Sequence, residues 1–437
     1  MGVARLINPN KKVSLSIAFC LILGSILFAG RLQETTLEKP NGALTTDKDV
    51  TSTLEVLGRP FSKPAYARNV WDMQVFEGKI YMGHGNSSNL GPSPNAGPVP
   101  VYYYDPVTDK FIVQDVVSPI SSTKTTEIKK YVDEEQIDIF KVFNGTLYIP
   151  GHDPRRESWE YGNYYKLSGD NWVKYRNVPK GIHVYDMAYY NGKLFAALGG
   201  RSSEVLMSED DGVTWEKIGV VSESGPPRAY TLFEFKNKLY AVSAIIPQNN
   251  IWPDAAEILT ISESKKKENL EAVRTTVYGS KMFPDIIKDG AIPYMRMVRT
   301  STVKDKLLYI AGEIHNDHQW IPQGLFVATD LGSARGVIFP NADALPMDIL
   351  VRGDQIYVLA YVKNSSRLYT NMVYKIKAKD LDKDANWIEL FRFSQDTFAR
   401  SFEELNGDFY FGLGSDVEPL SESSGTILRV RSNLYQN

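Results

Sequence analysis

Residues 185–199 read YDMAYYNGKLFAALG, and variants of this pattern occur seven times along the chain. In each copy a hydrophobic strand runs into a tight turn of the Asn-Gly type, and a second strand follows. Asn and Gly tolerate the positive φ angles that two-residue hairpin turns need. The other copies are WDMQVFEGKIYMG (71–83), IDIFKVFNGTLYIPG (137–151), YTLFEFKNKLYAVS (230–243), RTSTVKDKLLYIAG (299–312), MDILVRGDQIYVLA (347–360) and ARSFEELNGDFYFGLG (399–414).

The hairpin turns recur with a period that is typical of a repeat fold. They lie near residues 78, 145, 192, 238, 306, 353 and 407, and the two longest intervals predict insertions near 118–135 and 245–290. A third strand follows each hairpin, and several fourth strands are visible, among them KFIVQDV at 110–116. Seven such units predict an all-β, seven-bladed β-propeller of four-stranded antiparallel blades. A two-domain α/β enzyme is disfavoured, because no long segment of 3.6-residue period appears after residue 30.

The last repeat lacks its fourth strand, because the chain ends soon after the third strand, GTILRVRSN (425–433). The strand TSTLEVLG, residues 51–58, precedes the first hairpin without a partner of its own. Pairing of Thr51–Gly58 with Gly425–Ser432 would close the ring and remove an exposed sheet edge. We therefore expect the propeller to occupy residues 51–437.

The N-terminal residues 1–30 are typical of a targeting segment. Arg5, Lys11 and Lys12 precede an uncharged run over 13–30, which orients the rest of the chain outward. Small residues are missing at the −3 position of any cleavage site near 29–30, which favours an uncleaved signal-anchor over a signal peptide. A polar linker over 31–50 follows. The sequence thus predicts an exported protein, extracellular or periplasmic, with membrane contact through residues 13–30.

The amino-acid composition excludes several classes of protein and of site. Lys and Arg number 49 against 52 Asp and Glu, so a basic footprint for nucleic acid is absent. The single cysteine, Cys20, rules out a disulfide framework and a cysteine-rich metal site.

The segment SEDDGVTW, residues 208–215, matches the Asp-box pattern S-x-D-x-G-x-T-W through Ser208, Asp210, Gly212 and Trp215. The chain therefore resembles the Asp-box, or BNR, propellers of the sialidase-like superfamily. In such a box the Asp carboxylate and the hydroxyls bind turn amides, Gly supplies a positive φ and Trp packs between blades. The resemblance implies a structural role for these four residues. The chain is not expected to be a sialidase, since an Arg-Ile-Pro sequence preceded by Tyr or Phe is missing.

Propeller geometry gathers one set of polar residues at a single mouth. The innermost strand of each blade starts at one face, here called the top, and its tight turn lies at the bottom. Residues that open first strands or close second strands therefore converge on the top. The register of the seven hairpins places Tyr185, Tyr230, Arg299 and Arg400 at equivalent positions, each about seven residues before its hairpin turn. The candidate ligand-binding residues are Arg228, Arg299, Arg400, His84 and His152.

This set of residue types suits an acidic polysaccharide. Arg presents planar donors for carboxylate or sulfate, and Tyr and His can serve as base and acid in β-elimination. The repulsion among gathered guanidinium groups favours a bound anion. The candidate catalytic residues are Tyr230 or Tyr185 as the base and His183 as the assisting group. Trp159, Trp252 and Trp320 are expected in loops, as stacking platforms for sugar rings.

Two alternatives remain open at this point. No cofactor is predicted, but His84, His152, His183 and Glu313 leave a divalent metal as an alternative without a supporting ligand spacing. The second alternative replaces glycan binding or cleavage with a non-catalytic scaffold or assembly factor at the cell envelope. The uncleaved anchor and the frequent use of propellers as interaction platforms favour that alternative.

Overall fold

The computed structural model describes residues 48–87, 95–120, 125–155, 157–223, 228–245, 255–264, 269–286, 294–315, 319–416 and 420–435. The described residues all belong to one compact unit, Thr46–Asn437. The predicted targeting segment and nearly all of the predicted linker lie outside the described residues.

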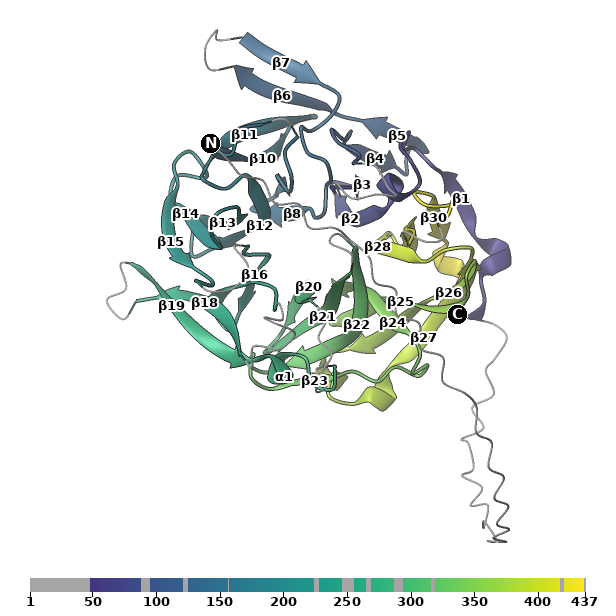
Figure 1. The fold of residues 1–437 in the computed structure, drawn as a ribbon. Coiled ribbons are helices and arrows are strands. Elements are labelled where there is room, and N and C mark those ends of the chain that lie inside the picture. Colours follow the sequence, from purple (N-terminus) through teal and green to yellow (C-terminus); the bar gives the residue numbers. More distant parts are fainter. Residues whose placement is uncertain are drawn as a thin grey trace, which may run out of the picture. The chain divides into compact units, whose positions relative to one another are not determined.

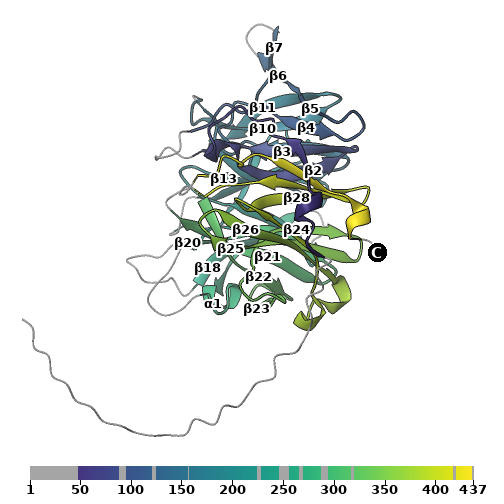
Figure 2. The ribbon, with the colours of Figure 1, turned by 90° about the vertical axis from the view of Figure 1, so that its right-hand side faces the viewer.

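Seven antiparallel sheets surround a central axis, as the hairpin repeats predict (Figures 1 and 2). Blade 1 contains β2 (Val70–Phe76), β3 (Lys79–His84), β4 (Tyr102–Asp105) and β5 (Lys110–Val113). Blade 2 contains β8 (Lys141–Phe143), β9 (Thr146–Pro150), β10 (Tyr161–Ser168) and β11 (Asn171–Pro179), and blade 3 contains β12 (His183–Tyr190), β13 (Lys193–Gly199), β14 (Glu204–Ser208) and β15 (Glu216–Val220).

The remaining blades follow in chain order around the ring. Blade 4 contains β16 (Thr231–Phe235), β17 (Lys238–Val242), β18 (Ala255–Glu263) and β19 (Leu270–Tyr278). Blade 5 contains β20 (Tyr294–Val303), β21 (Lys306–His315), β22 (Gln319–Ala328) and β23 (Ala334–Gly336). Blade 6 contains β24 (Leu345–Arg352), β25 (Gln355–Ser365), β26 (Leu368–Lys377) and β27 (Ile388–Gln395). Blade 7 contains β28 (Ala399–Leu405), β29 (Asp408–Leu413) and β30 (Ile427–Val430), with β1 (Glu55–Gly58) as its outer strand.

Closure of the ring by the N-terminal strand is confirmed. β1 pairs antiparallel with β30, with Glu55 opposite Arg429 and Val56 opposite Leu428. Arg429 Nε donates to a Glu55 carboxylate oxygen at 2.7 Å. The strand is shorter than expected, because Thr51–Thr53 forms a 3-10 turn.

Both predicted insertions are built into blades. β6 (Asp115–Ile120) and β7 (Thr125–Lys129) form a hairpin that extends blade 2 to six strands and projects from the rim in both views (Figures 1 and 2). The expected fourth strand at 110–116 therefore ends at Val113, since residues 115–117 pair in parallel with β11 of blade 2. In the second insertion, β18 and β19 are long and the short helix α1 (Gly279–Met282) follows them.

The turn chemistry explains why the hairpins form where they do. Asn191 and Gly192 have φ angles of 49° and 76°, and Glu77 and Gly78 have 48° and 72°. Two successive positive φ angles define the type I′ turn, whose twist matches the strands on either side. The hairpin turns therefore set the register that brings the inner strands to the axis.

The Asp-box fixes a turn of blade 3 against blade 2. Asp210 Oδ1 accepts hydrogen bonds from Ser208 Oγ and the Thr214 amide, both at 2.8 Å, and Gly212 has a φ of +91°. The Gly212 carbonyl accepts the hydroxyl of Tyr164 from β10 at 3.1 Å, and the Trp215 ring lies edge-on to Tyr164 at 6.0 Å. Because Ser208 pairs with Leu194, two residues after the hairpin turn, the box lies at the bottom face.

A chain that begins at Leu57 should melt at a clearly lower temperature than one that begins at Lys48, because it loses the strand segment that covers β30. The uncovered edge should also promote self-association, which gel filtration would reveal. Equal melting midpoints for the two chains would refute closure by β1.

Asp210→Ala should lower the melting temperature without weakening any ligand bound at the top mouth, because the lost carboxylate caps only bottom-face turn groups. Val213→Ala is the matched control, since the Val213 side chain in the same turn is 69% exposed. A variant that kept its melting temperature but lost ligand affinity would contradict this assignment of faces.

Candidate functional site

A ring of polar contacts joins the innermost strands around the channel. In six blades the position four residues before the end of the innermost strand carries a polar side chain that contacts the next blade. Blade 2 has Ile139 there, and Lys141 makes its junction instead. The seven junctions are Asp72 to the Phe140 amide (2.7 Å), Lys141 to Asp186 (2.8 Å), Asp186 to the Leu232 amide (2.8 Å), Thr231 to the Met297 carbonyl (3.0 Å), Arg299 to Asp348 (3.4 Å), Asp348 to the Phe402 amide (3.2 Å) and Ser401 to the Val70 carbonyl (2.8 Å).

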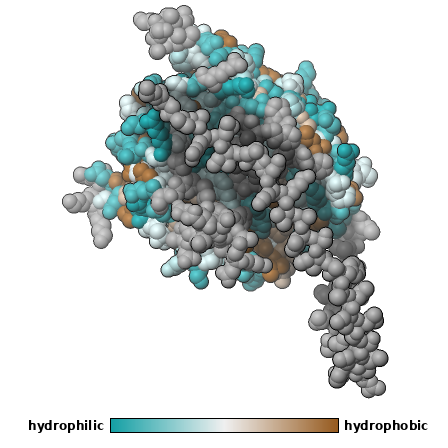
Figure 3. All heavy atoms as spheres, in the orientation of Figure 1, coloured by the Kyte–Doolittle hydropathy of each residue, from teal (hydrophilic) through white to brown (hydrophobic). Residues whose placement is uncertain are grey.

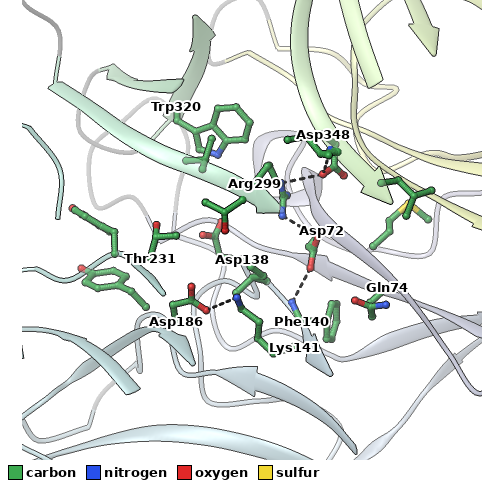
Figure 4. A pocket seen from close by; sticks show the side chains of 18 of the residues that line it. Asp72, Gln74, Asp138, Phe140, Lys141, Asp186, Thr231, Arg299, Trp320 and Asp348 are labelled. Atoms are coloured by element: carbon green, nitrogen blue, oxygen red, sulfur yellow. Dashed lines mark hydrogen bonds and ion pairs between the residues drawn. The ribbon is translucent and has the colours of Figure 1, made fainter. Parts of the chain in front are cut away.

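Arg299 also spans the channel itself (Figure 4). Its Nη1 lies 2.9 Å from Asp72 Oδ1, so a side chain of blade 5 reaches blade 1 as well as blade 6. The same guanidinium donates to the Trp71 carbonyl. Arg299 has a φ of +50° in a bulge of β20, and this backbone conformation is uncommon outside glycine.

Two expectations from the sequence are corrected at Arg299. Tyr185, Tyr230 and Arg400 lie five residues before the end of their strands, whereas Arg299 lies four residues before the end of β20, beside the bulge between Val298 and Ser301. The expectation that its charge needs an external anion is also wrong, since Asp72 and Asp348 neutralise it.

The channel encloses a cavity of about 230 Å³ lined by carboxylates and cations together. Burial raises the pKa of Asp72 to about 7, although Arg299 opposes that shift. Burial also raises the pKa of Glu403, near the bottom of the cavity, to about 8. At Asp138, burial is outweighed by nearby positive charges, including those of Arg296 and Arg299, and the pKa falls below its usual value.

Above this layer the aromatic side chains of blades 2 to 5 form one cluster, here called the mouth cluster: His152, His183, Tyr185, Tyr230 and Tyr294. Tyr185 is central, with ring centroids at 4.7 Å from Tyr230, 5.1 Å from His152 and 5.4 Å from His183. The hydroxyl oxygens of Tyr230 and Tyr294 lie 2.5 Å apart. The structure thus brings all three candidate catalytic residues into contact.

Two arginines flank the mouth cluster. The Arg296 guanidinium lies over the Tyr230 ring at 4.6 Å from its centroid. Arg228 is an exposed residue, and its side chain lies close enough to Tyr185, Tyr230 and Tyr294 to interact with them electrostatically. An exposed guanidinium beside a tyrosine surface can hold a planar anion while the ring faces contact apolar parts of the same ligand.

The hydrogen bonds of His183 define its tautomer. Nδ1 lies 3.0 Å from the His152 carbonyl oxygen, which can only accept, so Nδ1 carries the proton. Asp153 Oδ1 lies 3.3 Å from the same nitrogen. Burial lowers the pKa of His183 to about 4, so the ring is neutral at pH 7 and Nε2 holds a lone pair.

Burial shifts the pKa values of two tyrosines in the opposite direction, upward. Burial, assisted by the Tyr230 hydroxyl, raises the pKa of Tyr185 well above its usual value, and burial does the same at Tyr294. Both hydroxyls therefore remain protonated near neutral pH. They suit hydrogen-bond donation better than proton abstraction.

Two candidate ligand-binding residues lie apart from the mouth cluster. His84 has no exposed surface; its ring packs on Phe61 at 4.3 Å, and Nε2 lies 3.0 Å from the Pro100 carbonyl oxygen. Arg400 is also fully buried, with its guanidinium 3.7 Å from the centre of the Trp71 ring.

The predicted sugar platforms differ in exposure. Trp159 is 60% exposed, and its ring lies 5.9 Å from His183. Trp320 is not in a loop, because it belongs to β22 and is buried. Trp252 lies outside the described residues.

Sequence reasoning missed Asp72, Asp186 and Asp348 of the channel, and Tyr294. The repeats contain WDM at 71–73, YDM at 185–187 and MDI at 347–349, and this recurring Asp is a signal that could have revealed Asp72, Asp186 and Asp348. Tyr294 follows the long second insertion, where the start of β20 is hard to locate from the pattern alone.

Within the described part of the chain, no cluster of three or more His, Cys, Asp or Glu side chains could hold a metal ion. The same part of the chain contains no helix that could cross a membrane.

Comparison with known proteins shows the fold alone. No family model and no curated protein matches the chain. Among solved structures, YCF48 from Cyanidioschyzon merolae aligns with a TM-score of 0.44 at 8% identity, over 87% of this chain and 99% of that one. The Pan2 WD40 domain of Neurospora crassa aligns with a TM-score of 0.48 at 10% identity, over 86% of this chain and 94% of its own. An ancestral GH74 enzyme aligns with a TM-score of 0.45 at 9% identity, over 83% of this chain and 47% of the enzyme.

The melting temperature should fall as pH rises from about 5 to about 8 and level off above that range. The pKa of the Glu403 carboxyl is raised from 4.5 to about 8, so the folded chain holds this proton at pH values where the unfolded chain has released it. The folded state binds more protons in that range, so its stability declines there as pH rises. Glu403→Gln should flatten this decline, and an unchanged slope would contradict the assignment.

Proposed function

We propose that the top mouth binds an acidic polysaccharide or oligosaccharide, with uronate or sulfated sugars as the ligand class. The observation that carries this proposal is that Arg228, an exposed residue, has its side chain beside the tyrosines of the mouth cluster. Arg228 supplies the partner for a carboxylate or sulfate, and exposed Trp159 lies beside His183 as a stacking surface for a sugar ring. Arg299 is no longer counted as a ligand-binding residue, because its ion pairs with Asp72 and Asp348 hold the blades together.

The predicted export of the chain agrees with such a ligand, because acidic polysaccharides are found outside cells and in cell envelopes. The non-catalytic scaffold or assembly factor remains the competing function. It predicts a protein partner at the same mouth and no affinity for sugars.

A second proposal, cleavage by β-elimination, rests on the geometry of His183. Its Nε2 would take the proton from the carbon next to the uronate carboxylate. The bond between the neighbouring carbon and the glycosidic oxygen would break, a carbon–carbon double bond would form, and the Tyr230 hydroxyl would supply a proton to the leaving oxygen. This exchanges the roles first expected for tyrosine and histidine, because the neutral His183 ring has a lone pair on Nε2.

Arg228→Gln should weaken binding of a uronate oligosaccharide by roughly tenfold to a hundredfold, the loss expected for one charge-assisted hydrogen-bonding group. Calorimetry with residues 48–437 would measure this, with a neutral oligosaccharide of equal length as the ligand control. Arg335→Gln is the matched protein control, since Arg335 pairs with Asp384 at the outer part of its blade.

Equal affinity of the parent and Arg228→Gln for every acidic glycan that the parent binds would refute the site. Absence of any acidic glycan ligand would refute the function and favour the scaffold. Cleavage has its own measurement, the absorbance of unsaturated sugar ends: it should appear with the parent and vanish in His183→Ala. Binding without new absorbance would refute cleavage alone.

A further inference from the structure

Arg400 lies on β28 in an apolar enclosure of aromatic rings. Its side chain has no exposed surface, and the guanidinium carbon lies 3.7 Å from the centre of the Trp71 ring, 5.2 Å from Trp320 and 5.9 Å from Phe398. Trp71 and Trp320 are themselves buried. The charge therefore lies against ring faces, which attract a cation without accepting its hydrogen bonds.

The guanidinium lacks hydrogen-bond acceptors. Among the described residues, none accepts a hydrogen bond from Nε, Nη1 or Nη2 of Arg400. Two other buried guanidinium groups are hydrogen-bonded. Arg68 donates to the carbonyls of Lys63, Ser424 and Glu422, and Arg429 donates to Glu55. At Arg296 and Arg299 the only buried nitrogen without a hydrogen-bond partner among the described residues is Nε, whereas all three nitrogens of Arg400 lack one. Buried polar groups are normally hydrogen-bonded, so Arg400 departs furthest from that rule.

A buried hydroxyl close to Arg400 also lacks a hydrogen-bond partner. The Tyr66 hydroxyl is buried and has no hydrogen-bond partner in the described part of the chain, and it interacts electrostatically with Arg400. Asp138 exerts an opposite-charge influence on Arg400, accepts from Gln136 at 3.0 Å and, among the described residues, forms no ion pair with Arg400. Three guanidinium nitrogens and one hydroxyl therefore have donor hydrogens that no described residue accepts.

We propose that these unpartnered donors of Arg400 and Tyr66, beside Trp71 and Trp320, form a subsite for a small monoanion such as a single carboxylate or a halide. A cluster of donors alone is satisfied by an anion that accepts from several of them at once. Trp320 also lines the channel cavity, together with Tyr185, Tyr230 and Arg296 of the mouth, so the subsite adjoins the region proposed to bind glycans. In its carboxylate form the inference rests on the proposed function, since the terminal carboxylate of a bound glycan would then occupy the subsite.

The burial of Arg400, Tyr66 and both indole rings limits the ligand to a small anion. A carboxylate can lie in the plane of the guanidinium and accept two parallel hydrogen bonds. The subsite should therefore discriminate formate, acetate and chloride from bulky sulfonates.

The test titrates residues 48–437 with sodium formate, acetate, chloride and monomeric galacturonate, at an ionic strength held constant with a bulky sulfonate salt. Tryptophan fluorescence and the melting temperature are followed. The parent should show a saturable fluorescence change and a rise in melting temperature with formate, since Trp71 and Trp320 contact the binding group. A response to chloride as well as to carboxylates identifies a general small-anion site. A response to carboxylates alone identifies a site for the end of an acidic ligand. Both results support the subsite.

Arg400→Met should abolish the response while keeping the apolar contact with Trp71. Tyr66→Phe should weaken formate binding about tenfold, because one donor is lost. Arg335→Met is the matched control and should respond as the parent does. In anion-free buffer Arg400→Met should melt no lower than the parent, whereas Arg68→Met, which breaks satisfied hydrogen bonds, should melt lower.

A parent that gives no saturable response to any of the four anions overturns the proposal, as does a response that persists in Arg400→Met. If Arg400→Met does not fold, Tyr66→Phe decides, and an unchanged formate affinity overturns the subsite. Arg228→Gln separates the two proposals, because it should lose oligouronate affinity and keep the formate response. In the parent, a formate response without oligouronate binding refutes the glycan function alone, and oligouronate binding without a formate response refutes the subsite alone.

Discussion

The ring of side-chain contacts around the axis is the constraint on which the rest of this propeller depends. Hydrophobic packing between blades is strong but non-directional, so it does not by itself fix how far one blade turns against the next. An aspartate such as Asp186 fixes the angle between two blades, because it must accept a hydrogen bond from one particular amide of the neighbouring strand. A buried carboxylate without that partner would carry a large desolvation cost.

This ring also determines where chemistry can occur. Arg299 joins blades 1, 5 and 6 across the channel, so its charge is committed to the fold. The groups left for a ligand lie above it: the exposed Arg228, the Arg296 guanidinium on Tyr230, and the neutral ring of His183. Figure 3 shows a mainly hydrophilic rim among the described residues of the face in view, with scattered apolar residues. The candidate site is thus a polar and aromatic mouth over a channel that Arg299 bridges.

Much of the fold could be predicted from the sequence because its signals are local. Asn191-Gly192 requires a hairpin, and the segment 208–215 requires an Asp-box turn. Closure by β1 followed from counting strands, which needs no geometry. The expected grouping of Arg299 with Arg400 failed because the turn between β20 and β21 is Lys304–Asp305, earlier than the position near 306 that the repeat pattern suggested. This hairpin has no Asn-Gly pair to mark its turn in the sequence.

Side-chain partners were harder to predict than positions. Arg299 and Arg400 looked alike in the sequence, yet one is paired with two aspartates and the other lies against indole rings. The most direct test of the account is a crystal structure of residues 48–437 with a uronate oligosaccharide. The account predicts ligand density at the mouth, with a carboxylate in hydrogen-bond contact with Arg228. Density at the bottom face, or an empty mouth at saturating ligand, would contradict it.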